Sequence, residues 1–156
     1  MDSSYSQKMK TAILSDLQTL VDSGVLNSIV AVDYSKQFVN NYTWPGYPSA
    51  LVAPPTISTS EYEDTVSNVR EYTWNILIVT TTDNLSPNDP TYLEGLVDAV
   101  LNVFDLDCTL QGSSVAAVMP AVLEPPGPVS SNSITYVTFY VTLKARALVS
   151  AGVKTN

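Results

Sequence analysis

Side chains that could carry chemistry are sparse in this chain, which contains one cysteine and no histidine. Without histidine, the usual general base and the commonest ligand of zinc and other transition metals are missing. Cys108 therefore has no partner for a nucleophilic pair, and its position just past a predicted helix favours a small, semi-buried, unreactive residue. Acid–base or metal chemistry would have to rest on carboxylates.

Because carboxylate pairs can hydrolyse glycosides, we consider separately whether the acidic residues could form a catalytic pair or a metal site. Glu61, Glu63 and Asp64 form an acidic run that looks like a solvated stretch of charge. The interval 83–89 resembles a calcium loop but lacks the central glycine and closing glutamate of an EF-hand. Neither a Walker A lysine loop nor a glycine-rich dinucleotide motif is present. We expect no catalytic, metal-binding or cofactor-binding residue, no cofactor, and a protein that is not an enzyme.

Composition is typical of one globular domain, here residues 1–156, with 45% apolar and 14% charged residues. The formal charge of −8, with only 7 Lys and Arg, argues against non-specific binding to nucleic acid or anionic membranes. There is no N-terminal leader pattern and no apolar run of membrane-spanning length. Because a lone cysteine cannot form an internal disulfide, we expect folding in a reducing cytoplasm.

Two amphipathic helices are predicted from their end signals. Ser4 and Gln7 have the spacing of a capping box, and Gly24 follows the apolar stripe of the first helix as its stop. The second helix is predicted to have Asp89 as its N-cap and Pro90 at its first position, followed by a wide apolar stripe.

Strands are predicted where apolar and polar residues alternate or cluster between turn signals, at 29–34, 49–53, 70–82, 115–123 and 134–148. The polar stretch 56–68 is predicted to be a protruding hairpin or loop. Together these elements predict an α+β domain, in which a mainly antiparallel sheet carries two amphipathic helices packed on one face.

The other face of the sheet is predicted to carry four aromatic side chains among threonines: Tyr72, Trp74, Tyr136 and Tyr140. Such aromatic enrichment with few charges is typical of protein interfaces, so assembly is the favoured interpretation. In the alternative, one or more of these rings fold under the polar stretch 56–68. The acidic run has two interpretations as well: a solubilising loop, or the inner rim of a ring whose carboxylates repel passing DNA.

Four segments, with the first helix, carry a resemblance at the level of architecture. They are YPSALV (47–52), REYTWNI (70–76), the helix that starts at Asp89-Pro90, and YVTFYVTLKARAL (136–148). In this order they resemble the tail-terminator or tail-completion proteins of long-tailed bacteriophages. Two features are less typical of that family: the long stretch 37–48, and Asp105 and Asp107 at the end of the second helix, where acidic charge is disfavoured.

The resemblance implies a hexameric ring at the head-proximal end of a phage tail, made in the host bacterial cytoplasm and located in the virion. Such a ring stops tail-tube polymerisation and joins the tail to the head connector. Its partners would be other copies of the chain, the tail-tube protein and the connector proteins, while DNA passes through without specific binding and no membrane is involved. The four aromatic residues would make subunit or tube contacts, and the acidic run would lie near a rim or lumen.

Three alternatives to a tail terminator remain open. They are another phage neck or tail component, a small-ligand or peptide-binding module with a pocket between sheet and helices, and a carboxylate-dependent hydrolase. The ring hypothesis predicts that Trp74→Ala or Tyr140→Ala impairs assembly without unfolding the subunit.

Overall fold

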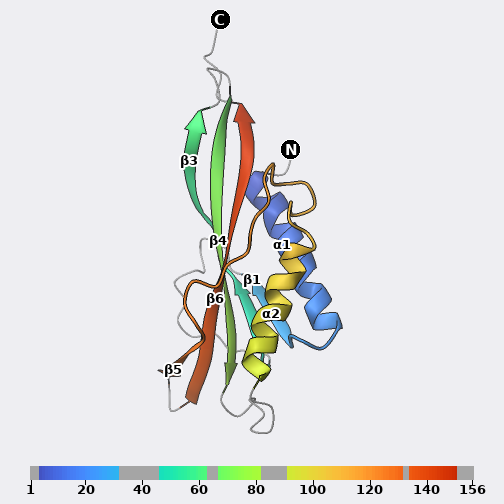
Figure 1. The fold of residues 1–156 in the computed structure, drawn as a ribbon, viewed down its shortest axis with the longest axis vertical. Helices are drawn as coiled ribbons and strands as arrows, with labels where there is room; N and C mark the ends of the chain where they lie inside the picture. Colours follow the sequence, from blue (N-terminus) through green and yellow to red (C-terminus); the bar gives the residue numbers. More distant parts are fainter. Residues whose placement is uncertain (1–3, 32–45, 63–66, 82–90, 132–133, 151–156) are drawn as a thin grey trace, which may run out of the picture.

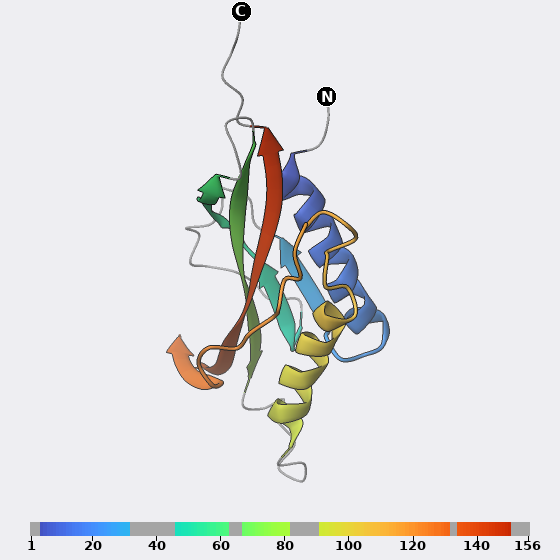
Figure 2. The ribbon, with the colours of Figure 1, turned by 45° about the horizontal axis from the view of Figure 1, so that its top comes forward.

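Two helices lie side by side on one face of a twisted sheet and run in opposite directions (Figures 1 and 2). The computed structural model describes residues 4–31, 46–62, 67–81, 91–131 and 134–150. The helices are α1 (Tyr5–Asp22) and α2 (Tyr92–Asp105). The strands are β1 (Ser28–Ala31), β2 (Ser49–Val52), β3 (Thr56–Tyr62), β4 (Ser67–Thr81), β5 (Gly127–Ser131) and β6 (Ile134–Ser150). The predicted α+β class with a mainly antiparallel sheet is confirmed.

Two long central strands, β4 and β6, form the spine of the sheet. They pair antiparallel from Ser67↔Ser150 to Thr81↔Tyr136. The strand order is β1-β2-β4-β6-β5, and β3 also pairs with β4, so β2 and β3 follow each other along one edge of β4. Only the β1–β2 pairing is parallel among the described strands. The antiparallel β3–β4 pairing agrees with the protruding hairpin predicted at 56–68.

The capping box of α1 is formed as predicted. The Ser4 side chain accepts a hydrogen bond from the Gln7 backbone N–H (3.1 Å), and the Gln7 side chain accepts one from the Ser4 N–H (3.1 Å). The helix ends at Asp22, and Gly24 follows with a φ of 84°, a conformation that glycine adopts without strain. Met9, Ile13 and Leu17 are completely buried, so the apolar stripe faces the sheet as expected.

Helix α2 begins later than predicted. Its N-cap is Thr91, whose carbonyl accepts the first helical hydrogen bond from the Gly95 N–H (2.9 Å). Asp89 and Pro90 lie outside the described residues. The predicted apolar stripe is confirmed, because Leu96, Val100 and Phe104 are buried.

The strand predicted at 115–123 is wrong. Residues 106–126, here called the edge loop, instead run beside β6 and touch it through separate backbone hydrogen bonds, including Val115 N–H to Arg146 O (2.8 Å) and Ala121 N–H to Thr142 O (3.0 Å). A continuous ladder is interrupted because Met119 has a φ of 42° and Pro120 has no N–H to donate. Cys108, at the start of this loop, is exposed rather than semi-buried.

Candidate assembly interface

Two of the four predicted interface aromatics belong to the core, which corrects the assignment of the β4 faces. Tyr72 is 3% exposed and Trp74 is 1% exposed, and both join the cluster that includes the buried side chains of α1 and α2. In the β4–β6 register, Trp74 lies opposite Leu143 and Tyr72 opposite Ala145. Directly opposed residues share a face, so both rings must face the helices together with the apolar residues of β6.

Tyr136 and Tyr140 do lie on the outer face of the sheet, which is the face away from the helices. Tyr140 is 56% exposed, opposite the half-buried Leu77. Tyr136 is half-buried, and its ring centroid lies 6.0 Å from that of Tyr47 at an interplanar angle of 48°. Partial burial, and then the contact with Tyr136, raise the pKa of Tyr47, so this tyrosine is neutral at physiological pH. Tyr140 is therefore the more available ring for a partner.

A groove of about 650 Å³, here called the outer groove, opens beside Tyr140. Its apolar wall includes Leu123 and Val129, and Asn75 and Thr142 contribute polar groups. Leu123 is 77% exposed and Val129 is also exposed, which is unusual for neighbouring large apolar side chains. Sequence reasoning missed both residues because it placed Leu123 in a predicted strand and left Val129 between two predicted strands.

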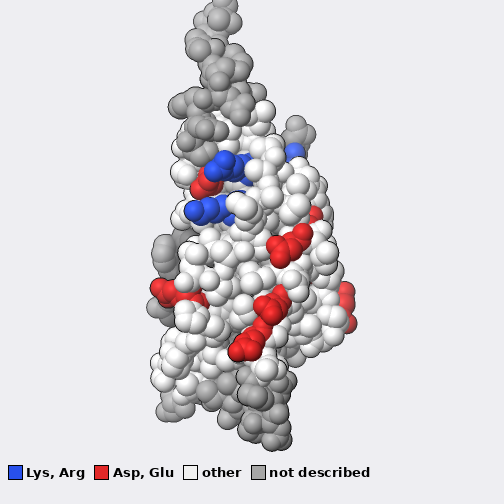
Figure 3. Space-filling view, viewed as in Figure 1, with Lys and Arg blue, Asp and Glu red and all other residues white. Residues whose placement is uncertain are grey.

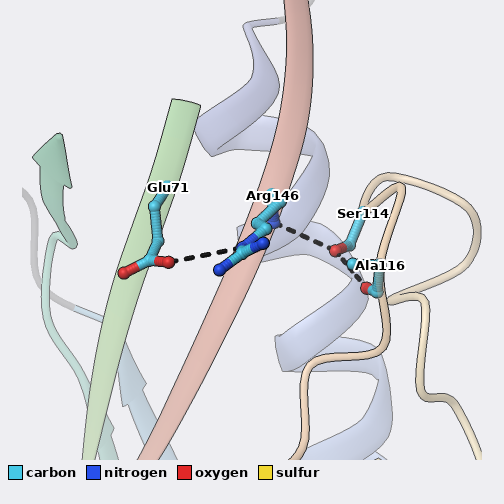
Figure 4. A network of polar contacts seen from close by, with 4 residues as sticks. All are labelled: Glu71, Ser114, Ala116 and Arg146. Carbon is cyan, nitrogen blue, oxygen red and sulfur yellow. Dashed lines mark hydrogen bonds and ion pairs between the residues drawn. The ribbon is translucent and has the colours of Figure 1, made fainter. Parts of the chain in front are cut away.

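Polar contacts hold the rest of the outer face in place. The Thr142 hydroxyl donates to the Asn75 side-chain oxygen at 2.8 Å. Further along β6, Arg146 Nε lies 3.4 Å from Glu71 Oε2, and both groups belong to the outer face (Figure 4). This exposed ion pair fixes side-chain positions more than it stabilises the fold.

Ser114 anchors the edge loop to β6 in the same network (Figure 4). Its buried hydroxyl accepts a hydrogen bond from the Arg146 backbone N–H (3.0 Å) and donates one to the Ala116 carbonyl (2.6 Å). The side chain thus satisfies one backbone donor and one acceptor at the point where the loop joins the strand.

Ser114→Ala is expected to lower the free energy of unfolding by about 1–2 kcal/mol, because it leaves a backbone donor and an acceptor without this partner. Urea denaturation followed by far-UV circular dichroism measures the change. Ser130→Ala is the matched control, since Ser130 is exposed on β5, and it is expected to change stability by less than about 0.5 kcal/mol. Equal effects of the two substitutions would contradict the anchoring role of Ser114.

Asp16 of α1 and Asp107 of the edge loop form a buried carboxyl pair away from the outer groove. Burial, followed by a hydrogen bond to Asp107 and repulsion from its charge, raises the pKa of Asp16 to about 8. Apart from this contact between the carboxyls, the buried Oδ2 atoms of both residues have no hydrogen-bond partner among the described residues. Asp107 also accepts the Gln111 backbone N–H (2.8 Å). These contacts explain an acidic residue just beyond the end of α2.

Asp16→Asn is expected to stabilise the protein by about 2 kcal/mol at pH 8 and to have little effect at pH 4. The folded state keeps Asp16 protonated up to about pH 8, whereas an unfolded chain ionises this group above its usual value of 3.8. Stability contributed by the protonated group therefore falls as pH rises between these values. Thermal denaturation across this pH range tests the prediction, with the exposed Asp105→Asn as control. An unchanged pH slope in Asp16→Asn would contradict it.

The structure describes only part of the acidic run formed by Glu61, Glu63 and Asp64. Glu61 lies in β3, opposite Val69 of β4, while Glu63 and Asp64 lie outside the described residues. Within the described ranges, no group of three or more His, Cys, Asp or Glu could hold a metal ion. No described helix has both the length and the apolar character that a membrane span requires.

The outer face can bind a partner through the apolar side chains of the outer groove. The polar side chains on the same face are held in place by the Thr142–Asn75 hydrogen bond and the Arg146–Glu71 ion pair. Grooves of the described chain open on the outer face, along α2, between α1 and the edge loop, and between α2 and the residues just before β2. Comparison of the chain with protein-family models and with curated protein sequences gave no match.

Proposed function

We propose that this chain is a structural virion subunit that closes into a ring, hexameric in the simplest case, at the head-proximal end of a phage tail. There it stops polymerisation of the tail tube and joins the tail to the head connector. The observation that carries the proposal is the outer groove, where Tyr140, Leu123 and Val129 remain exposed at the outer face of the sheet. The architectural resemblance to tail-terminator proteins supplies the role of the assembly.

Physical features of the outer face support burial by another protein. A large ring and aliphatic groups surround a concave surface, and hydrogen-bonded or ion-paired polar side chains lie along the same face. An apolar centre with a polar margin is the usual composition of a protein interface. Tyr140 is suited to an anchoring role, because tyrosine provides a large contact area with few rotatable bonds.

The overall charge is compatible with a conduit for DNA. With a formal charge of −8 and 7 Lys and Arg, the chain offers few groups that neutralise phosphates. A ring of several such subunits would repel DNA along its path, which allows passage without adhesion. The head connector and the tail-tube protein are the protein partners of this proposal.

A peptide-binding module is the second candidate, because the volume of the outer groove, about 650 Å³, is in the range of ligand sites. In that case the purified protein would bind an extended apolar peptide as a monomer. A ring subunit would instead bury the groove in its own assembly or against the tube.

Tail-tube polymerisation in vitro tests the proposed function. The tube protein encoded in the same genome is allowed to polymerise with increasing amounts of this chain, and tube lengths are measured by electron microscopy. We expect tubes that stop growing at substoichiometric amounts, with extra density at one end. Unchanged tube lengths and bare tube ends at molar excess would overturn the terminator role.

A further inference from the structure

In Figure 3, the basic side chains gather towards one end of the molecule together with an acidic side chain, and most other acidic side chains lie further along it. Its basic residues are Lys8 and Lys10 near the start of α1 and Arg70, Lys144 and Arg146 on β4 and β6. These two groups lie at one end, because the Tyr5 hydroxyl donates a hydrogen bond to the Leu148 carbonyl (3.3 Å). Glu94, Asp98 and Asp105 instead lie on α2, and the other acidic residues are spread over the rest of the domain, including Glu71 beside Arg146. The domain therefore presents surfaces of opposite charge at different places.

The basic surface on β6 also carries exposed apolar side chains. Lys144, Arg146 and Leu148 are exposed on the outer side of β6, and Val115 and Met119 of the edge loop are exposed beside them. We call these five residues the basic patch. Arg146 is paired with Glu71, whereas Lys144 has no carboxylate within ion-pair distance among the described residues. Lys144 is thus the free charge in a patch of exposed aliphatic groups.

The acidic surface is a groove of about 860 Å³ between α2 and the edge loop, here called the acidic groove. Its apolar lining includes Leu93, Val97 and Val122, all half-buried, and its α2 side carries exposed Glu94 and Asp98. Neither carboxylate has an ion-pair partner among the described residues. The groove therefore suits an apolar surface that brings positive charge.

We infer that the acidic groove receives the basic patch of a second copy of this chain, so that Lys144 of one copy faces Asp98 of the next. Lys144 lies on the outer side of β6, whereas Asp98 lies on α2, which covers the opposite face of the sheet (Figure 1), so these two charges meet only between copies. A contact between two different patches is heterologous, and its repetition gives a closed ring when the rotation closes. Opposite charges at the edge of this contact fix how the two copies are aligned, and the apolar side chains of the patch and the groove are buried between the copies. The inference rests on the proposed ring and adds a second contact to that of the outer groove, whose Tyr140 lies on the same side of β6 as Lys144.

Charge reversal of single residues tests this contact. Asp98→Lys and Lys144→Glu are each expected to raise the concentration needed for assembly at least about tenfold, because each places like charges across every contact. Asp22→Lys and Lys8→Glu make the same charge changes on α1, outside the two surfaces, and should assemble like the original chain. Native mass spectrometry and sedimentation velocity give the oligomer fractions, and circular dichroism verifies folding.

Mixing the two variants gives the sharpest result. In an alternating ring, the groove of each D98K copy would face the patch of a K144E copy, and the unchanged Asp98 of the K144E copy would face the unchanged Lys144 of the D98K copy. An equimolar mixture should therefore assemble when neither variant does alone, and the double variant should also recover. Normal assembly of both single variants, an unrecovered mixture of folded variants, or a wild-type chain that stays monomeric would overturn this contact. The tube-polymerisation experiment tests the terminator role separately. If this chain still stops tube growth while the mixture of D98K and K144E fails to assemble, the contact is wrong and the terminator role stands.

Discussion

Trp74→Ala is expected to lower the free energy of unfolding by about 3–5 kcal/mol, the largest stability effect that we predict. Trp74 is 1% exposed and lies opposite Leu143 at the centre of the β4–β6 pair. Truncation would leave a cavity under the helices, where the backbone of two long paired strands cannot collapse freely. Urea denaturation of the monomer at low concentration, with circular dichroism as the readout, measures the change.

Trp74→Phe provides the matched control for this substitution. It keeps most of the apolar volume and removes an indole N–H that is buried without a hydrogen-bond partner in the described chain. We therefore expect a loss of less than about 2 kcal/mol. If Trp74→Ala kept wild-type stability but lost assembly, Trp74 would face outward, and the interface assignment based on sequence would stand instead.

Tyr140→Ala, unlike Trp74→Ala, is expected to affect assembly rather than folding. The free energy of unfolding should change by less than about 1 kcal/mol, and the dissociation constant of the assembly should rise about 30-fold or more. The ring is 56% exposed in the subunit, so folding buries little of it, whereas assembly through the outer groove buries the rest. Sedimentation velocity over a concentration series measures the dissociation constant.

Leu106→Ala is the control for Tyr140→Ala. Leu106 is more exposed than Tyr140, but it lies at the end of α2 and does not line the outer groove. Its truncation should leave both stability and assembly unchanged. If the two substitutions weakened assembly equally, loss of exposed apolar surface in general would explain the result, and the outer groove would lose its assigned role.

The elements with strong local signals were predictable from the sequence. The Ser4–Gln7 capping box and the stop at Gly24 depend on neighbouring residues, so they could be identified without tertiary information. The apolar–polar alternation of the strand predicted at 134–148 likewise agrees with the structure, where every second residue of β6 from Val137 to Ala145 is buried. These signals were sufficient for the fold class because two amphipathic helices and an alternating sheet have few ways to bury their apolar faces.

The faces of β4 were harder to predict because both of them carry apolar side chains. The sequence pattern favours an outward orientation for Tyr72 and Trp74, yet their register opposite Ala145 and Leu143 places them in the core. Register is a long-range property, and a strand with two apolar faces gives little local information about it. The β6 alternation, combined with an assumed pairing register, would have been the only sequence signal for the correct assignment.

The outer groove could not be predicted for a related reason. It forms where the edge loop and β5 approach β6, and the irregular course of that loop depends on Met119 at positive φ and on Pro120. The sequence therefore places Leu123 in a predicted strand and Val129 between two predicted strands, with no signal of a groove. Of the predicted interface set, Tyr140 is the residue that the structure places in the groove, and Tyr136 lies on the same face against Tyr47.

The native mass of the purified chain, measured by native mass spectrometry and light scattering over a range of concentrations and salt, tests closed self-assembly most directly. We predict one discrete oligomer, a hexamer in the simplest case, which dissociates as salt rises because oppositely charged surfaces contribute to the contact. Tyr140→Ala should shift the same preparation towards monomer. A wild-type chain that stays monomeric at every concentration, or grows into open-ended aggregates without a discrete mass, would contradict the ring.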